Sequence, residues 1–585
     1  MNKLTKLKPA SVPPRYGFSP EKWQQLTSHM NQKDRSWLLD GISNGFDIYI
    51  SDSDKLKRSK VKNLPACVIR KLRTTEWIIK NIEKGAIWGP FDPDAPDFPT
   101  ILKDYRVSPV GAIPKGTHCG LSDEEKKWRV IHHLSHPRND ISVNSEVLEE
   151  WSTVSYVSFK EVVKMVHSLG PDALLWTVDA KDAYLRVPIK KKCMKHMCFR
   201  WASKLFAFTC LSFGLTSAPR IYTLFADAML SIIQRLNPGI WKVGDQPRTY
   251  HYIDDFFGGA PADQAHIAFE QFNATFSGFE ILDVPTTHDK CEGPDRTRKI
   301  LGFIYDTHRR MLFIPEIKKK AMLIDIEKCL HPGTKRVSRD LIQSLIGKLR
   351  WFSNCLWAGP AFVRRMETEV NRLSRGKWSV WIPIEPMKED LIWWQRAIKH
   401  SEDGILMEDI LKKRSEWDHK VWTDASTGDG MGGWSGDGQW YRYHWPLSSN
   451  DIFRDPSHPD IYWKEMCAVA TACVIWGEEW TGKSVLFRCD NEACVYSLNK
   501  KSCSLKRPDV MALIRIIADC VNRFKFIPYI IHIPGKLNLT ADALSRFDEK
   551  KFHNDTNGVP MLPRPTSSEE QLGKLVENFA MICDL

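Results

Sequence analysis

The chain has 585 residues, a length that predicts several packed domains rather than one hydrophobic core. Hydrophobic residues make up 43% and charged residues 26%, which argues against long disordered tracts. The net charge is +12, and residues 1–90 hold 17 Lys and Arg against 8 Asp and Glu. This bias indicates nucleic acid or an acidic membrane surface as a partner, or simply a solvated basic face.

The predicted elements of the first half alternate between helices and strands. Helices are expected around Trp23–Leu39 and over 66–85, and the Pro/Asp-rich stretch 86–102 is expected to be a loop that ends in a strand-like segment. A buried strand is predicted at 174–178 and helices at 218–236 and 262–280. Two strands are predicted around an acidic turn, at 249–253 and 256–257.

The second half begins with helices and ends in another mixed region. Residues 315–375 favour helices, with Leu341, Leu345 and Leu349 on one face and Ser338 as an N-cap. A Trp-rich connection follows over 376–415, then an α/β unit over 420–547, with hairpin turns expected at Gly432, Gly433 and Gly438. The polar tail contains one short amphipathic stretch at 572–582.

The cysteine pattern and the lack of long apolar runs predict an intracellular protein. None of the 15 cysteines lies in a CxxC pair, and the sequence has neither an N-terminal signal core nor a run of 18 apolar residues. We therefore expect reduced thiols that mostly fill the core, a location in the cytoplasm, the nucleus or both, and no membrane partner.

Three carboxylates in the first half predict a metal site. Asp179 ends the strand at 174–178, and Asp254 and Asp255 lie in the turn Tyr252-Ile-Asp-Asp-Phe256. Adjacent carboxylates in a partly desolvated site repel one another, and a pair of Mg²⁺ ions, with Mn²⁺ as an alternative, relieves that repulsion. Strand alternation favours Asp179 and Asp254 as the main ligands and Asp255 as a weaker one. The alternative is a solvent-exposed Asp-Asp turn.

Six motifs across residues 105–305 resemble the reverse transcriptase family, in the family's order. Val178-Asp-Ala-Lys-Asp-Ala-Tyr184 resembles its first catalytic motif, and Tyr252-Ile-Asp-Asp255 resembles its Tyr-x-Asp-Asp box. The other four are the fingers segment Lys127-Trp-Arg129, Leu211-Ser-Phe-Gly-Leu-Thr-Ser-Ala-Pro219, Asp289-Lys-Cys291 and the primer-grip entry Leu301-Gly-Phe303. Retroviral enzymes usually have Gln-Gly where this chain has Phe213-Gly214, a pair that resembles LTR retrotransposons instead.

The resemblance implies a role for each residue that would bind substrate. Arg129, Lys115 and Lys127 would neutralise the triphosphate, and Tyr184 would exclude a 2′-hydroxyl beneath the sugar. Phe213 and Gly214 would line the nucleotide site, where a residue without a Cβ lets the backbone approach. Lys290 would protonate the departing pyrophosphate. The alternatives are surface salt bridges for the basic residues, core packing for Tyr184 and an ordinary turn at Gly214.

A second set of four carboxylates resembles the RNase H family. The motifs are Val421-Trp-Thr-Asp-Ala-Ser426, Trp463-Lys-Glu465, Phe487-Arg-Cys-Asp-Asn491 and Thr540-Ala-Asp-Ala-Leu-Ser-Arg546. The resemblance implies that Asp424, Glu465, Asp490 and Asp542 hold two further Mg²⁺ ions. His532 is the nearest candidate for the mobile histidine of that family. Scattered surface acids are the alternative.

Together these features predict a multidomain α/β (α+β) fold: a right-hand polymerase with fingers, palm and thumb, a helical connection and an RNase H-like domain. The expected segments are 1–104, 105–314, 315–415, 416–547 and a linker or tail, 548–585. The expected function is an RNA-directed DNA polymerase with ribonuclease H activity, acting on an RNA template, a DNA primer, an RNA–DNA hybrid and deoxynucleoside triphosphates.

The closest resemblance is to DIRS-like, tyrosine-recombinase retrotransposons. It rests on Asn44-Gly-Phe46, Gly89-Pro-Phe91, Ser108-Pro-Val-Gly-Ala-Ile-Pro-Lys115, Trp128-Arg-Val-Ile-His-His-Leu-Ser135 and Gln343-Ser-Leu-Ile-Gly-Lys-Leu349. Two rivals stay open: a domesticated, non-catalytic nucleic-acid-binding scaffold that keeps the fold, and a protein that keeps ribonuclease H but not polymerase activity.

Overall fold

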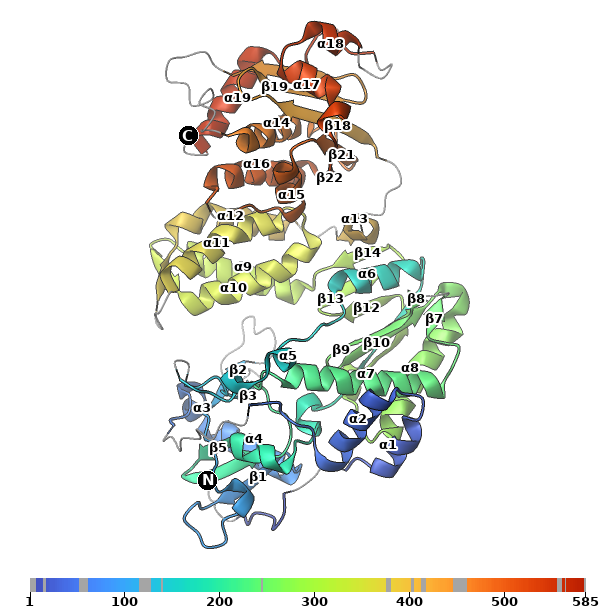
Figure 1. The fold of residues 1–585 in the computed structure, drawn as a ribbon, viewed down its shortest axis with the longest axis vertical. Helices are drawn as coiled ribbons and strands as arrows, with labels where there is room; N and C mark the ends of the chain where they lie inside the picture. Colours follow the sequence, from blue (N-terminus) through green and yellow to red (C-terminus); the bar gives the residue numbers. More distant parts are fainter. Residues whose placement is uncertain are drawn as a thin grey trace. The chain divides into compact units, whose positions relative to one another are not determined.

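The computed structural model describes residues 7–13, 17–51, 61–114, 128–137, 140–243, 246–374, 380–400, 404–411, 417–445, 460–504, 506–554, 560–562 and 564–582. The chain divides into two compact units, Met1–Phe313 and Ile314–Leu585. Both units combine helices and strands, so the expected mixed α/β fold is confirmed (Figure 1). Among the described helices, none is long and apolar enough to cross a membrane.

A four-stranded antiparallel sheet forms the centre of the first unit. Its order is β11 (Glu292–Asp295), β4 (Leu174–Asp179), β10 (Asp255–Ala260) and β9 (Thr249–Tyr252), which confirms the strands predicted at 174–178 and on both sides of the acidic turn. The predicted helices are α7 (Ala218–Leu236) and α8 (Ala265–Ile281). In the core, the Trp176 indole donates to Gln271 Oε1 of α8 at 2.8 Å.

The other strands of this unit form smaller ladders. The strands β1 (Ile87–Phe91), β6 (Lys204–Phe208) and β5 (Cys198–Trp201) pair in that order, and β2 (Val110–Pro114) pairs with β3 (Trp128–His132). A hairpin series comprises β12 (Thr297–Ile300), β13 (Phe303–Asp306) and β14 (Met311–Phe313), and β7 (Lys242–Val243) pairs with β8 (Gln246–Pro247). The remaining helices are α3 (Pro65–Ile69), α4 (Lys71–Glu83), α5 (Glu149–Ser152) and α6 (Phe159–Ser168).

Three predictions near the N-terminus are wrong. The single helix expected over 66–85 is two helices, α3 and α4, which are separated at Arg70. The single helix expected at Trp23–Leu39 is two helices, α1 (Pro20–Leu26) and α2 (Gln32–Asn44), because the Asn31 side chain caps a new helix by accepting from the Asp34 backbone N–H. The strand expected at the end of 86–102 lies at its start, in β1, where every residue is buried against β6.

The fully buried Trp23 of α1 stacks on Phe225 of α7, with ring centroids 5.3 Å apart.

The second unit begins with packed helices. These are α9 (Glu316–Leu330), α10 (Arg339–Phe352), α11 (Gly359–Ser374), α12 (Lys388–Lys399) and α13 (Met407–Leu411), with the short strands β15 (Arg336–Ser338), β16 (Trp381–Pro383) and β17 (Ile405–Leu406). Ser338 caps α10 as predicted, since its hydroxyl accepts from the Leu341 N–H at 3.3 Å. Leu345 and Leu349 are buried, whereas Leu341 is only partly buried and Ile342 takes its place in the core.

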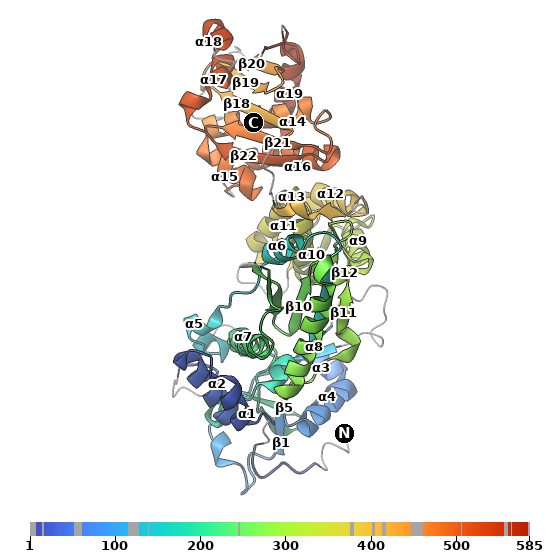
Figure 2. The same cartoon turned by 90° about the vertical axis from the view of Figure 1, so that its right-hand side faces the viewer.

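A five-stranded sheet follows, in the order β20-β19-β18-β21-β22. Its members are β18 (His419–Ala425), β19 (Gly430–Ser435), β20 (Trp440–His444), β21 (Ser484–Cys489) and β22 (Ile527–His532); the first three pair antiparallel, and β18, β21 and β22 pair parallel. The helices α14 (Ile461–Trp476) and α16 (Pro508–Phe524) lie along one face, and α17 (Leu539–Ser545) lies along the other (Figures 1 and 2). Helix α15 (Glu492–Lys500) follows β21.

Two of the three glycine turns predicted in this sheet are wrong. Gly432 and Gly433 lie inside β19, and a Cβ on Gly432 would come within 2.4 Å of the Leu544 side chain. Glycine at that position therefore lets α17 approach the sheet closely. Gly438, with a φ of +93°, does lie in a turn. The tail forms two more helices, α18 (Glu549–Asn554) and α19 (Glu569–Ile582), and the second includes the predicted amphipathic stretch.

Candidate functional site

The acidic hairpin of the first unit brings three carboxylates together. Ile253, with a φ of +54°, and Asp254 form a two-residue turn between β9 and β10. Asp255 lies directly opposite Asp179 on β4, and the Ala180 N–H donates to the Asp254 carbonyl at 2.8 Å. Directly opposed residues of antiparallel strands share a face. The straight strand assumed in ranking Asp255 below Asp254 is not present, because Asp254 belongs to the turn, and the ranking of the two ligands stays a prediction.

The electrostatics of this cluster call for a cation. Burial, followed by the charge of Asp179, raises the pKa of Asp254. Desolvation by the surrounding protein and the charges of Asp254 and Asp179 raise the pKa of the Asp255 carboxyl, although its side chain is exposed. The Lys290 ammonium lies 2.5 Å from Asp179 Oδ1 and supplies positive charge. These hard oxygen donors suit Mg²⁺, which prefers carboxylates and keeps other positions for water and phosphate.

Arg129, Phe213 and Tyr184 lie next to one another beside these carboxylates. The Arg129 guanidinium lies 4.4 Å from the centroid of the Phe213 ring, and that ring lies 5.1 Å from the ring of Tyr184. Tyr184 is buried, and burial together with nearby charges that include Asp254 raises its pKa, so its phenol stays neutral. The structure thus groups three of the predicted substrate-binding residues.

Gly214 is required for a reason that the sequence did not reveal. Its φ is +115°, and a Cβ there would lie 2.0 Å from the backbone oxygen of His132. The chain therefore needs glycine to pack this loop against β3. Asn144 holds the loop as well, since its amide donates to the Gly214 carbonyl at 2.8 Å and accepts from the Thr216 N–H at 2.9 Å.

Two predicted triphosphate-binding residues, Lys115 and Lys127, lie outside the described residues. Sequence reasoning also missed Lys84 as a neighbour of the segment that carries Asp179. Lys84, at the end of α4, forms an ion pair with Asp182, three residues after Asp179. No local motif signals that contact, because the two residues are 98 positions apart. The pair ties the helix at 71–83 to the segment that carries Asp179.

The four predicted carboxylates of the second unit come from separate elements. Asp424 lies in β18, Glu465 in α14, Asp490 directly after β21 and Asp542 in α17. The Ser545 hydroxyl donates to Asp424 Oδ2, and the Ala425 N–H donates to Glu465 Oε1 at 3.3 Å. The fold therefore gathers residues that the sequence separates by more than a hundred positions.

Three of these four carboxylates have raised pKa values. Burial and the charges of Asp490 and Asp542 raise the pKa of Asp424 to about 7, against the hydrogen bond from Ser545. Burial raises the pKa of Glu465 well above its ordinary value. Burial also raises the pKa of Asp490, and the charge of Asp542 raises it further. As in the first cluster, the carboxylate oxygens have too little positive charge around them. Divalent cations would supply that charge.

Asp542 is the exception. Burial alone would raise its pKa, but ion pairs with Arg546 and Lys551 lower it. Arg546 Nε lies 2.6 Å from Asp542 Oδ1, and Lys551 Nζ lies 2.7 Å from Oδ2. Sequence reasoning missed Lys551, because it lies in the segment expected to be a linker or tail.

Two other side chains adjoin this cluster. The buried Cys489 thiol donates to Glu465 Oε2 at 3.7 Å, and ligand atoms of Glu465, Cys489 and Asp490 lie within 4.8 Å of one another. Sequence reasoning missed Cys489 as a neighbour of the site. His532 lies at the exposed end of β22, with Nε2 3.1 Å from the Asp490 carbonyl, so it does adjoin the site.

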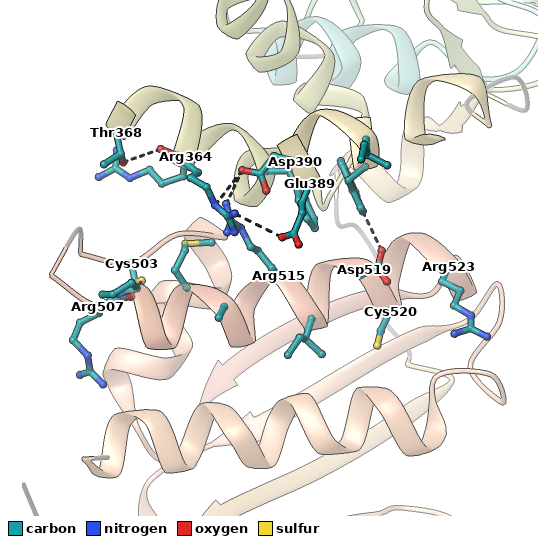
Figure 3. A pocket seen from close by; sticks show the side chains of 18 of the residues that line it. Arg364, Thr368, Glu389, Asp390, Cys503, Arg507, Arg515, Asp519, Cys520 and Arg523 are labelled. Carbon is teal, nitrogen blue, oxygen red and sulfur yellow. Dashed lines mark hydrogen bonds and ion pairs between the residues drawn. The ribbon is translucent and has the colours of Figure 1, made fainter. Parts of the chain in front are cut away.

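A large cavity in the second unit, lined by charged and apolar side chains, contains none of these described carboxylates. It has a volume of about 970 Å³ and lies between α11 and α12 on one side and α16 on the other (Figure 3). Arginines and acidic residues line it: Arg364, Arg365, Arg396, Arg507, Arg515, Arg523, Glu389, Asp390 and Asp519. Asp390 is its most buried acid and pairs with Arg515 at 2.8 Å.

The first unit thus has an antiparallel sheet with carboxylates at a tight hairpin, and the second unit has a mixed sheet with its own carboxylates. Residues 113–305 match the family model described as "Reverse transcriptase (RNA-dependent DNA polymerase)". This match covers about a third of the chain and spans the whole first carboxylate cluster. The second cluster lies outside it.

The solved structures similar to this chain include foamy viral proteins. The foamy viral protease-reverse transcriptase dRH in complex with double-stranded DNA is 13% identical, with a TM-score of 0.43, and the match covers 91% of this chain and 85% of that chain. The same viral protein with an RNA/DNA hybrid is 11% identical, with a TM-score of 0.41 and coverages of 93% and 88%. No curated protein matches the chain.

Proposed function

We propose that this protein is an RNA-directed DNA polymerase that also cleaves the RNA of the resulting RNA–DNA hybrid. The observation that carries the proposal is the register of β4 and β10, which sets Asp255 opposite Asp179 next to the Asp254 turn. This arrangement lies inside a matched reverse transcriptase domain. The basic bias of residues 1–90 supports nucleic acid as the partner.

In the polymerase site, Asp179, Asp254 and Asp255 would hold Mg²⁺. When bound, the metal supplies the positive charge that phosphoryl transfer needs at the attacking and leaving oxygens. Tyr184 and Phe213 form an apolar wall on which the deoxyribose and base of the incoming nucleotide would rest. Arg129 beside that wall would pair with the triphosphate through its planar fork of donors.

Lys290 would change partners when substrate binds. Burial lowers its pKa, but the hydrogen bond to Asp179 and the surrounding negative charges outweigh burial and raise it. Lys290 therefore carries a proton at neutral pH and could donate it to the departing pyrophosphate. Its half-exposed side chain leaves it room to move from Asp179 towards that group.

In the second site, Asp424, Glu465, Asp490 and Asp542 would hold Mg²⁺ for hydrolysis of the RNA strand. Ser545 orients Asp424, and Ala425 orients Glu465 through its backbone N–H. His532 is exposed beside Asp490 and could contact the product phosphate. The ribonuclease H resemblance of residues 420–547 supports this half of the proposal.

The test is primer extension on an RNA template with deoxynucleotides and Mg²⁺, with template cleavage followed in the same reaction. We expect Asp254→Asn to abolish extension and to leave cleavage intact, and Asp490→Asn to do the reverse. Asp263→Asn, an exposed carboxylate beyond the far end of β10, is the matched control and should leave both activities unchanged.

Three outcomes would contradict the proposal in different ways. A folded wild type that binds the hybrid but neither extends nor cuts it would make the protein a nucleic-acid-binding scaffold. A wild type that cuts without extending would leave ribonuclease H activity alone. Loss of both activities in Asp254→Asn with unchanged thermal stability would contradict the assignment of two separate sites.

We also propose a DIRS-like retroelement as the origin of the chain and an intracellular location for it. The motifs Asn44-Gly-Phe46 and Gln343-Ser-Leu-Ile-Gly-Lys-Leu349 support that origin. A tyrosine recombinase encoded next to this chain in its element would support the subtype, and an integrase of another class would contradict it.

A further inference from the structure

The C-terminal segment after α17 contributes to the second carboxylate cluster. Helix α18 is anchored on the sheet by the buried Phe552, whose ring lies 5.2 Å from that of Trp440 in β20. Glu549 at the start of the helix pairs with Arg442 of the same strand at 2.5 Å. Lys551 lies between these two anchors in the chain, so its backbone position follows from packing on both sides of it.

The ammonium of Lys551 is aimed at a candidate metal ligand. Nζ lies 2.7 Å from Asp542 Oδ2, and the Asp542 side chain is only 22% exposed. Arg546 occupies the other oxygen of the same carboxylate. Both oxygens of Asp542 therefore already have cationic partners, whereas Asp424, Glu465 and Asp490 form no ion pair to Lys or Arg among the described residues.

A lysine ammonium and a divalent metal ion compete for the same carboxylate oxygen. Lys551 would therefore leave the Asp542 carboxylate if Asp542 held Mg²⁺, because a divalent cation attracts the carboxylate more strongly than an ammonium does. The Lys551 side chain is 38% exposed on a flexible stem, so its ammonium is free to turn outwards. The nearest strong acceptors would then be the phosphates of the nucleic acid strand at the site.

We propose that Lys551 is a substrate-positioning residue that binds a backbone phosphate of the RNA–DNA hybrid only when metal occupies the second site. Without metal the ammonium stays on Asp542; with metal it adds one phosphate contact near the point of cleavage. This inference rests on the proposed ribonuclease H function, because it assumes that a hybrid reaches this cluster. It assigns part of the site to a segment that lies beyond the ribonuclease H-like motifs.

The test compares Lys551→Gln with wild type for binding of a DNA hybrid whose RNA strand carries 2′-O-methyl groups, with Mg²⁺ and with EDTA. One lost phosphate contact reduces the slope of log K against log salt by about 1. We expect that reduction in Mg²⁺ and no difference from wild type in EDTA. Lys551→Arg should restore the slope, and Lys550→Gln, the exposed neighbour, should behave as wild type.

A second readout follows the metal without nucleic acid or turnover. Because Lys551→Gln removes a competing cation, Mn²⁺ titrated by electron paramagnetic resonance should bind this variant several-fold more tightly than wild type. In steady-state cleavage of an unmodified hybrid, Lys551→Gln should have a higher KM than wild type and nearly the same kcat.

The outcomes separate this inference from the function on which it rests. Equal loss of hybrid affinity in Mg²⁺ and in EDTA would make Lys551 a general surface charge and overturn the inference. Weaker Mn²⁺ binding with a lowered Tm would make it a structural ion pair and overturn it too. If wild type fails to cleave any hybrid but the Mg²⁺-dependent difference in binding persists, the proposed function fails and the role of Lys551 in binding stands.

Discussion

Replacing Asp390 by Asn should change how the stability of the protein depends on pH. This carboxyl group is buried against the arginine-lined cavity, 2.8 Å from Arg515 and 3.5 Å from Arg365 (Figure 3). Burial, partly offset by the two arginines, raises its pKa from 3.8 to about 6. Burial likewise lowers the pKa of Arg515. Desolvation therefore outweighs attraction in this ion pair.

The sign follows from proton binding. The folded protein holds a proton on Asp390 more tightly than the unfolded chain does, so the stabilisation from that proton is full below pH 3.8 and is lost as the pH rises through 6. Each unit of difference between the two pKa values corresponds to about 1.4 kcal/mol. Wild type should therefore lose about 3 kcal/mol relative to Asp390→Asn across this window, because the amide does not titrate.

The assay is urea unfolding of the full chain, followed by tryptophan fluorescence, at several values between pH 3.5 and 7. The quantity compared is the difference in unfolding free energy between wild type and Asp390→Asn, since any constant effect of the amide on Arg515 cancels in its pH dependence. Glu389→Gln, an adjacent carboxylate that is 86% exposed, is the control and should show no such trend. Taken as wild type minus variant, this difference should fall as the pH rises. A difference that stays constant or rises with pH would refute the argument that burial dominates.

Two further substitutions test packing in the first unit. Gly214→Ala should abolish primer extension and lower Tm, because its Cβ would lie 2.0 Å from the His132 carbonyl oxygen. Gly239 also has a positive φ but no neighbour within 4 Å, so Gly239→Ala should have a far smaller effect. Equal effects of the two substitutions would contradict the close-approach argument. Trp23→Ala should cost about 3–5 kcal/mol by emptying a buried site against α7. The exposed Trp381→Ala should leave Tm nearly unchanged, and a similar loss in both variants would argue against docking of α1 through Trp23.

Local patterns in the sequence predicted much of the first carboxylate site. Asp179 follows a continuous apolar run, and the Asp254–Asp255 pair lies between two segments of β-favouring residues, so both strands and the turn could be placed. The relative roles of the two aspartates could not, because they depend on a two-residue turn and on register with a strand about 75 positions earlier. Strand period alone does not determine register between distant segments.

The second site shows the same division. Its four carboxylates were found because each lies in its own short motif, but the contacts of Ser545 with Asp424 and of Lys551 with Asp542 could not be predicted. A lysine in a polar, proline-containing tail has no local pattern that distinguishes it from a solvated charge. The burial of Phe552 against β20 and the ion pair of Glu549 with Arg442 bring that lysine to the site.

The sequence by itself determined the mixed α/β class, the order of the main helices and strands and the two sets of acidic residues, because these depend on residue spacing within each segment. The tertiary structure decided which carboxylates face one another, why Gly214 must be glycine and which lysines neutralise the acids. These properties depend on contacts between residues far apart in the chain, where burial and charge are set by packing rather than by local pattern.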